Sequence, residues 1–520
     1  MATQDSVYKN TTLPSNTVFI RTFMRILPKG RRGLSMGLPL LSVTALPLLL
    51  MLSFSSKAES QLQLEPCYLD GLSEKVECGS LTLPENYDAP DGNTIEVHFA
   101  RLPAIKPTPG KQPLLLISGG PGQSAIDSAE MFDLLFSKVR RKHDLILVDQ
   151  RGTGRSNALT CPTELLGDAL EINDETQPMP ELMRQCYEQL SGDVRFYDSQ
   201  SALKDLEQVR AHLNINSWHV YGISYGTRMA QLYMRHHPEA LKTVTLDGVV
   251  PMQESVMAIG PAISNAMDGV FAQCAADESC QQRYPNLKAQ LDKLSDELSQ
   301  KPKQVAILDP LSAESKTFLI TQTKLLSSLR MALYSPQSRS LIPFIIDSAA
   351  NGNVQPLLGL QGSEEEMGLA MGMHLAVVCS EDAGRVSELA KQELKHHSHL
   401  SKTLIELFDA ACPIWNMPQV GEDFSQPIDS SIPTLLLSGE HDPVTPPAWG
   451  ELAAEKLGNR LHLISPYATH GVIMQSCAPK LVHQLIEDNS LDNIDSECMG
   501  DDTHRAFYLN ANSVEPTTRL

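Results

Sequence analysis

The fold is decided by the stretch Trp218-His219-Val220-Tyr221-Gly222-Ile223-Ser224-Tyr225-Gly226-Thr227. An apolar run enters the pentapeptide Gly-Ile-Ser-Tyr-Gly, and a run with helical spacing of its apolar residues, Thr227 to His236, leaves it. A serine between two glycines at such a strand-to-helix turn sits on a sharp bend with its hydroxyl exposed. The pattern therefore predicts that Ser224 is a nucleophile, and the alternative is a serine that only stabilises a turn.

A glycine-rich turn lies upstream of this serine. The apolar run Leu114 to Ile117 has the character of a buried strand, and Ser118-Gly119-Gly120-Pro121-Gly122 follows it. Small residues let the backbone approach a ligand closely, so this loop is expected to donate a backbone N–H to an oxyanion. We expect that donor to be Gly120, with Tyr225 as the second, because Pro121 has no N–H.

An acid and a histidine follow the serine in the order that such a site needs. Asp442 comes after the strand-like run Thr434 to Leu437, and His470 lies in a loop before the helix-like run Val472 to Asp488. A histidine takes the proton of the serine and an acid orients the histidine, so Ser224, Asp442 and His470 are predicted to form a catalytic triad. This chain order is typical of α/β-hydrolases.

Neighbouring residues offer alternatives at two of these positions. Glu440 stands two residues before Asp442 and is a second candidate acid, while His441 and His483 compete with His470. His441 adjoins the acid with which it would have to pair, and His483 lies inside the last helical pattern. The loop position therefore favours His470.

The pattern along the chain predicts the fold class. From Gly79 to Gly248, strand-like runs alternate with amphipathic ones, as in a parallel sheet with helices. The next strand-like run begins only at Ile432, and helical patterns fill the chain between. We expect an α/β-hydrolase fold, that is, a mostly parallel sheet with helices on both faces and a mainly helical inserted cap domain. The expected parts are core segments at 59–250 and 429–498, the cap at 251–428, and a polar tail at 499–520.

Residues 1–58 are predicted to be a signal peptide with an N-terminal extension. Basic residues between Arg21 and Arg32 precede the apolar run Gly37 to Phe54, and Ser56-Lys57-Ala58 supplies small residues for cleavage near Ala58. An uncleaved membrane anchor is the alternative, because the run approaches the length that spans a bilayer. Cleavage would give a periplasmic or secreted protein with no stable membrane association.

Ten cysteines, all after residue 58, predict disulfides in an exported chain. Pairing of sequence neighbours gives Cys67 with Cys78, Cys161 with Cys186, Cys274 with Cys280, Cys379 with Cys412 and Cys477 with Cys498, although sequence alone does not fix connectivity. None of these pairs has the CxxC spacing of a zinc site, and we predict neither a metal nor a cofactor. His396, His397 and His399 could form a metal cluster, but we expect them to lie at a solvated helix end.

The net charge of −20 at pH 7 limits which molecules the protein is expected to bind. An acidic surface repels nucleic acid and anionic membranes, so neither is an expected partner. The oligomeric state is not set by any feature of the sequence.

Three motifs resemble the proline iminopeptidase and tripeptidyl aminopeptidase family of α/β-hydrolases, which are serine exopeptidases with a helical cap. They are Gly119-Gly120-Pro121-Gly122, Asp149-Gln150-Arg151-Gly152-Thr153-Gly154-Arg155-Ser156 and the serine pentapeptide continued to Thr227, within a resemblance over roughly residues 65 to 498. Ser118 departs from the histidine that is frequent in the family, which leaves the backbone role of the loop intact. The resemblance implies a serine aminopeptidase of prolyl or tripeptidyl type.

The resemblance also implies how a substrate is held. Aminopeptidases of the family bind the free α-ammonium of the substrate with acidic cap residues, and Val378-Cys379-Ser380-Glu381-Asp382 resembles the cysteine-acid segment of the tripeptidyl branch. Glu381 or Asp382 is therefore the implied anchor, and a peptide with a free N-terminus the implied partner. The alternative is a solvated acidic turn. A second acidic run, Glu364-Glu365-Glu366, is predicted to be an exposed helix start.

Two other functions fit the same scaffold. An exported esterase or lipase needs the same triad, and comparing an ester with an amino-acyl amide would separate it from a peptidase. A non-catalytic binding protein on a hydrolase fold is the other alternative, which the intact candidate triad disfavours.

Overall fold

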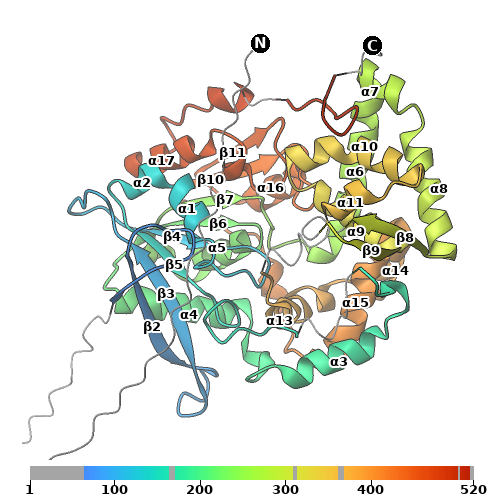
Figure 1. Cartoon of the computed structure of the whole chain (residues 1–520). Coiled ribbons are helices and arrows are strands. Elements are labelled where there is room, and N and C mark those ends of the chain that lie inside the picture. Colours follow the sequence, from blue (N-terminus) through green and yellow to red (C-terminus); the bar gives the residue numbers. More distant parts are fainter. Residues whose placement is uncertain (1–63, 163–169, 309–312, 361–367, 502–503, 516–520) are drawn as a thin grey trace, which may run out of the picture. The chain divides into compact units, whose positions relative to one another are not determined.

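The computed structural model describes residues 64–162, 170–308, 313–360, 368–501 and 504–515 (Figure 1). The predicted signal peptide at 1–58 and the acidic run Glu364 to Glu366 lie outside the described residues. No helix within these ranges is long and apolar enough to cross a membrane.

A nine-stranded sheet, ordered β1-β2-β3-β5-β4-β6-β7-β10-β11, forms the core. The strands from β5 to β11 in that order pair in parallel, and β1, β2 and β3 add an antiparallel edge. The predicted mostly parallel sheet is thus confirmed, with its core strands where the apolar runs placed them. The bounds are β1 (Glu65–Cys67), β2 (Val76–Pro84), β3 (Thr94–Leu102), β4 (Leu114–Ile117), β5 (Leu145–Val148), β6 (Trp218–Ile223), β7 (Leu241–Asp247), β10 (Thr434–Gly439) and β11 (Arg460–Ser465).

Helices cover both faces of this sheet. Successive side chains of a strand point to opposite faces, so a strand buried on both sides is apolar throughout. Leu115 and Ile117 of β4 pack in one cluster and Leu114 and Leu116 in another. The first cluster includes α4 (Ser199–His212), α5 (Tyr225–His236) and α16 (Pro447–Ala454), and the second includes α1 (Ala129–Leu135), α2 (Ser137–Arg140) and α17 (Ala478–Asp488).

Residues 248–433, between β7 and β10, are called the insertion below. Most of it is helical, but it also holds a hairpin, β8 (Lys303–Leu308) and β9 (Ser315–Ile320), that the sequence patterns did not predict. Apolar residues stand side by side at positions 305–308 and 318–320, so neither sequence shows the apolar–polar alternation that marks a half-buried strand, although Ile307, Phe318 and Ile320 are buried. The helices are α6 (Ile259–Ala276), α7 (Glu278–Arg283), α8 (Leu287–Gln300), α9 (Gln322–Ala332), α10 (Pro336–Ala350), α11 (Gln355–Leu358), α13 (Met371–Glu381), α14 (Glu388–His397) and α15 (His399–Trp415).

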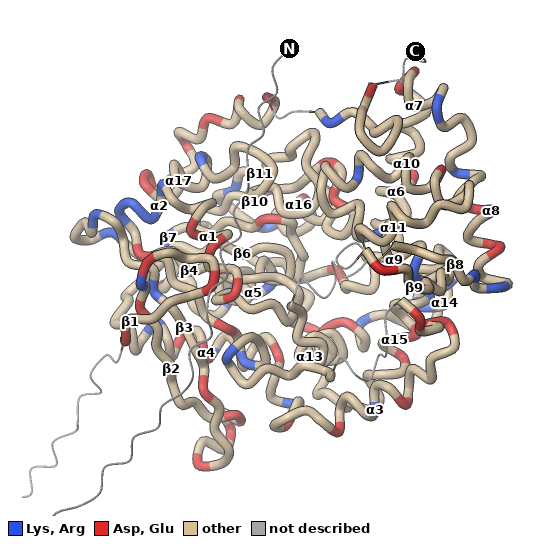
Figure 2. The backbone as a smooth tube through the Cα atoms, in the orientation of Figure 1, with Lys and Arg blue, Asp and Glu red and all other residues tan. Residues whose placement is uncertain are grey.

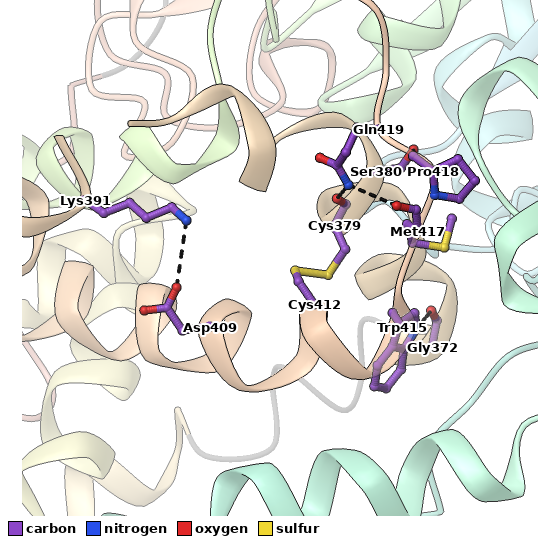
Figure 3. Close-up of a disulfide and its surroundings, with 10 residues drawn as sticks. All are labelled: Gly372, Cys379, Ser380, Lys391, Asp409, Cys412, Trp415, Met417, Pro418 and Gln419. Carbon is purple, nitrogen blue, oxygen red and sulfur yellow. Dashed lines mark hydrogen bonds and ion pairs between the residues drawn. A yellow bond between two sulfur atoms is a disulfide. The ribbon is translucent and has the colours of Figure 1, made fainter. Parts of the chain in front are cut away.

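The insertion packs in two different ways. Helices α6 to α11 enclose a core of their own, to which Phe507 and Leu509 of the C-terminal segment contribute. Helices α13 and α15 instead join the cluster on one face of the sheet. The disulfide between Cys379 and Cys412 ties these two helices together, and the indole N–H of Trp415 donates to the carbonyl of Gly372 at 3.0 Å (Figure 3). Helix α13 is therefore fixed both to its neighbour and to the sheet.

All five predicted disulfides are present with the predicted pairing. Such a set fits a protein of an oxidising compartment. The acidic residues are spread over many elements, whereas basic residues gather at α2 (Figure 2). The negative charge therefore does not mark one site.

Candidate active site

Ser224 lies at the bend between β6 and α5, with a backbone φ of 54° and ψ of −124°. A non-glycine residue in such a region costs about 1 to 3 kcal/mol and persists only where its surroundings hold it. Here the N–H of Ser224 donates to the carbonyl of Asp247 at 2.9 Å. A side chain at Gly222 would collide with the Gly226 carbonyl, and one at Gly226 with that of Ile117. The two glycines of the motif are thus required by close backbone approach.

The glycine-rich loop after β4 lies against this serine. A Cβ atom on Gly119 would stand 3.1 Å from the Cβ of Ser224, and Gly120 has a φ of 106°, which glycine adopts readily. Tyr225 begins α5, so its N–H belongs to the first turn, where no intrahelical acceptor exists. The loop and the start of α5 therefore adjoin Ser224, and Gly120 and Tyr225 remain the predicted oxyanion donors.

The Asp-Gln-Arg-Gly motif supports the glycine-rich loop from behind. The carboxylate of Asp149 accepts hydrogen bonds from the hydroxyl of Ser124 at 2.6 Å and the N–H of Ile126 at 3.0 Å. Arg151 is fully buried and forms two bonds of 2.7 Å to Asp205 of α4. Asp149 thus ties the motif to the chain just after the glycine-rich loop and Arg151 ties it to α4, so the motif that carried the family resemblance has a positioning role here.

His470 and Asp442 are paired. Nδ1 of His470 lies 2.8 Å from Oδ2 of Asp442, and the buried carboxylate also accepts the backbone N–H groups of Val444 and Thr445, each at 2.9 Å. Burial lowers the pKa of His470, but the charge of Asp442, its hydrogen bond and the charge of Asp247 together outweigh burial, so the pKa is raised. An imidazole held through Nδ1 presents Nε2 as the base.

The alternative residues lie elsewhere. Glu440 is exposed, and Nε2 of His441 lies 3.1 Å from the amide nitrogen of Gln273. His483 sits on α17 with its Nε2 3.8 Å from Glu487. None of these contacts involves Asp442, so the geometry brings His470 and Asp442 together and leaves their rivals apart.

The histidine group at the junction of α14 and α15 does not assemble as a metal site. Nε2 of His399 lies 3.3 Å from the hydroxyl of Thr323. In the part of the chain that the structure describes, no three histidine, cysteine or acidic side chains gather as a metal ion would require.

Asp247, which sequence reasoning missed, joins the two halves of the site. It ends β7 and is completely buried. Its carboxylate accepts the backbone N–H groups of Val472 at 2.8 Å and Ile473 at 2.9 Å, together with the hydroxyl of Tyr221 at 2.8 Å. Because its carbonyl holds the N–H of Ser224, one residue is bonded both to the nucleophile and to the loop after His470.

The residue after Asp247 touches the base itself. A Cβ atom on Gly248, whose φ is 64°, would lie 2.9 Å from Cε1 of His470. Ser224 and His470 therefore both abut the end of β7. Burial raises the pKa of Asp247 to about 6. The sequence signal that could have found this residue is a carboxylate at the end of a predicted core strand, at the edge where parallel strands present functional groups.

The two acids at the end of α13 have different surroundings. Asp382 forms two bonds to Arg228 of α5, at 2.8 and 3.1 Å, and further bonds to Arg385 and to the N–H of Val256. Both oxygens of Asp382 are thus engaged. Its role is to neutralise a buried arginine that lies four residues after Ser224, on the same face of the helix.

Glu381 keeps one oxygen without a hydrogen bond. Its Oε1 accepts the N–H of Ser199 at 2.9 Å, while Oε2, buried, lies 3.6 Å from Arg228. The Ser199 hydroxyl lies 2.6 Å from that of Tyr225, the residue after the nucleophile. Burial raises the pKa of Glu381 to about 7. The structure therefore leaves Glu381, and not Asp382, with a spare acceptor near the nucleophile.

Comparison with known proteins finds similarity to hydrolases. A family model described as the alpha/beta hydrolase fold matches residues 112–305, and one described as TAP-like protein matches residues 398–498. The serine protease Hip1 of Mycobacterium tuberculosis is 25% identical over 447 residues, which cover 78% of this chain and 84% of that protein. The tripeptidyl aminopeptidase of Streptomyces lividans is 23% identical over 209 residues, 37% of this chain and 39% of that protein. Carboxylesterase B of M. tuberculosis is 28% identical over 283 residues, 50% of this chain and 52% of that protein.

These matches extend over both core segments, and they include relatives named as serine peptidases. The chain therefore has the α/β-hydrolase fold with a TAP-like C-terminal region, and its resemblance to the proline iminopeptidase and tripeptidyl aminopeptidase family is confirmed at the level of a hydrolase of serine-peptidase type.

Proposed function

We propose that this protein is an exported serine aminopeptidase that releases N-terminal residues or short peptides through an acyl-enzyme. The Ser224 oxygen adds to the scissile carbonyl carbon while Nε2 of His470 takes its proton, and Asp442 stabilises the imidazolium. The N–H groups of Gly120 and Tyr225 bind the oxyanion, each contributing about 3 to 4 kcal/mol in comparable sites. His470 returns the proton to the leaving amine and then activates water, which hydrolyses the ester. The observation that carries the proposal is the pairing of His470 with Asp442, together with a strained Ser224 that, like His470, abuts the end of β7.

The choice of an aminopeptidase rests on Glu381. A substrate ammonium that leaves water for a closed pocket needs a carboxylate partner, because an unpaired buried charge is costly. Glu381 offers an oxygen without a hydrogen bond, on a helix held to its neighbour by a disulfide. The five disulfides support export to the periplasm or the medium.

The test compares a peptide amide with a free N-terminus and the same peptide acetylated there. Acetylation is expected to lower kcat/KM at least about 100-fold, the scale of a charge-assisted hydrogen bond in a dry site. Glu381→Gln keeps an oxygen for the Ser199 N–H but removes the charge, so it should slow the free-amine substrate far more than the blocked one. Glu393→Gln, at an exposed position on α14, is the matched control. Equal cleavage of free and acetylated peptides would exclude the exopeptidase.

An esterase is the second candidate, favoured by the match to carboxylesterase B. It needs the same triad and no ammonium anchor. An ester and an amide of the same amino-acyl group, assayed with wild type and Glu381→Gln, separate the two. An esterase would cleave only the ester and would be unaffected by the substitution at Glu381.

A further inference from the structure

Arg339 on α10 is a buried cation without an acidic partner. Its side chain is only 7% exposed, and Nη1 donates to Oε1 of Gln273 on α6 at 2.8 Å. Its Nε is buried and makes no hydrogen bond. Burial alone lowers the pKa of Arg339 to about 10, with no acidic group of the described residues close enough to offset it.

The other buried arginines show how unusual this is. Arg140, Arg151 and Arg228 each form an ion pair with an aspartate, at 2.7 to 2.8 Å. Arg339 is the one exception among the four arginines buried in the described part of the chain. A buried charge is strongly disfavoured unless it is paired, so an unpaired arginine is a candidate to bind an anion.

The surroundings of Arg339 lead to the triad. The amide nitrogen of Gln273 lies 3.1 Å from Nε2 of His441, which immediately precedes Asp442. Both Gln273 and His441 are only partly buried, so a ligand can reach them. Burial, with the charge of Arg339 as a further cause, lowers the pKa of His441 to about 4, which keeps its ring neutral. Arg339 is therefore the cation of a group in which the other members are uncharged.

The start of α10 also borders the base. The ring of Tyr334, two residues before this helix, packs edge-on against His470 with centroids 5.6 Å apart, and its carbonyl accepts the hydroxyl of Thr469 at 2.6 Å. Helix α10 therefore reaches both loops that carry the triad, one through Tyr334 and the other through Gln273 and His441.

We propose that Arg339 is a carboxylate-binding residue of the substrate site, with Gln273 and His441 as its neutral neighbours. This inference rests on the proposed peptidase function. A planar guanidinium binds a carboxylate through two parallel hydrogen bonds, and Arg339 has the donors to do so. The carboxylate is either the C-terminal group of a short peptide or an acidic side chain on the leaving part. In a chain of net charge −20, a local cation is also what allows an anionic group to approach.

The experiment uses three peptides of one sequence: the free C-terminal acid, the C-terminal amide, and the amide with one aspartate in the leaving part. Wild type should cleave the acid with a kcat/KM about 10- to 100-fold above that of the amide, the range of one charge-assisted contact. The aspartyl amide shows which carboxylate is bound, because its kcat/KM equals that of the free acid only if Arg339 binds an acidic side chain.

The variant Arg339→Met should remove this preference, so that acid and amide differ by less than about twofold. Its melting temperature should equal or exceed that of wild type, because an unpaired buried charge is removed. Arg184→Met, which deletes an exposed arginine of α3 (Met179–Gln189), is the control for net charge and should keep the preference. Equal losses for acid and amide in Arg339→Met, or a lower melting temperature, would make Arg339 a structural residue and overturn the proposal.

A binding measurement separates this inference from the proposed function. Calorimetric titration of Ser224→Ala with the peptide acid and its amide needs no turnover, and the acid should bind about 10- to 100-fold tighter. Tighter binding of the acid without turnover by wild type would refute the peptidase but support the subsite. Turnover of both peptides at one rate, with equal binding, would retain the peptidase and refute the subsite.

Discussion

Asp247→Asn probes the link between nucleophile and base. The carboxylate of Asp247 accepts the N–H groups of Val472 and Ile473 and so fixes the loop that presents His470. Asparagine has the same shape but only one acceptor oxygen, so one of these two N–H groups loses its partner. The carbonyl bond to the N–H of Ser224 belongs to the backbone and stays. The substitution therefore loosens the loop that presents His470 and leaves the bend at Ser224 intact.

The magnitudes predict an effect on catalysis and little on folding. Burial raises the pKa of Asp247 from 3.8 to about 6, so its contribution favours the native state at low pH and is lost as the pH rises through about 6. At neutral pH the ionised group costs about 3 kcal/mol, a figure that already includes its hydrogen bonds. A neutral asparagine avoids this cost but holds fewer N–H groups, so we expect unfolding free energy to change by less than about 2 kcal/mol. A shift of His470 by about 1 Å would lower kcat/KM about 100-fold.

The assay is the pH dependence of kcat/KM, together with urea unfolding at pH 7. His470 must be neutral to act as a base, and the charge of Asp247 helps to raise the pKa of His470 after that of Asp442. The acid limb should therefore move to lower pH in Asp247→Asn, a shift that loss of packing would not produce. Asp292→Asn, exposed on α8, is the control. Wild-type kcat/KM with an unmoved acid limb would refute the positioning role of Asp247.

Three further predictions concern the nucleophile, the ammonium anchor and the cap. Ser224→Ala should lower kcat about 10⁶-fold with an unchanged melting curve, and retention of a tenth of the activity would show another nucleophile. For free-amine substrates, kcat/KM should rise through about pH 7 as Glu381 ionises, because burial raises the pKa of its carboxyl. It should fall near pH 8 as the substrate amine loses its proton. A pH profile of Glu381→Gln identical to that of wild type would contradict this. Replacing Cys379 and Cys412 by serine should cost about 3 to 4 kcal/mol in urea unfolding, because the disulfide closes a long loop of the unfolded chain, and a loss below about 1 kcal/mol would show that other contacts fix α13.

The sequence was sufficient wherever a local pattern reports on local structure. The apolar runs predicted the core strands, and the glycines around Ser224 predicted the bend, because only glycine tolerates the close backbone contacts at Gly222 and Gly226. The neighbouring cysteines predicted the disulfides. The hairpin β8–β9 was missed because its apolar residues follow one another directly in each strand, so the sequence shows no apolar–polar alternation.

Pairings between distant segments were beyond such patterns. Arg228 and Asp382 are 154 residues apart in the chain, and nothing local indicates that one neutralises the other. For the same reason the sequence offered Glu381 and Asp382 as equal candidates, and only the contacts with Arg228 distinguish them. Asp247 was missed because its carboxylate acts on a loop 225 residues further along.

The topology explains why the candidate triad leaves a pattern in the sequence and the proposed contacts with substrate do not. The insertion leaves the sheet after β7, whose end holds the N–H of Ser224 and the loop of His470, and returns into β10, whose end leads to Asp442. In parallel sheets the functional groups lie at the carboxyl ends of the strands, so an insertion between these two strands starts and ends at the reacting groups. A functional residue at a strand end stands at a fixed distance along the chain from the apolar strand residues, and this spacing is visible in the sequence. Helices of the insertion need only bring a charge such as Glu381 or Arg339 to that edge, and a helix can do this from any of several positions along its length, so no spacing records it.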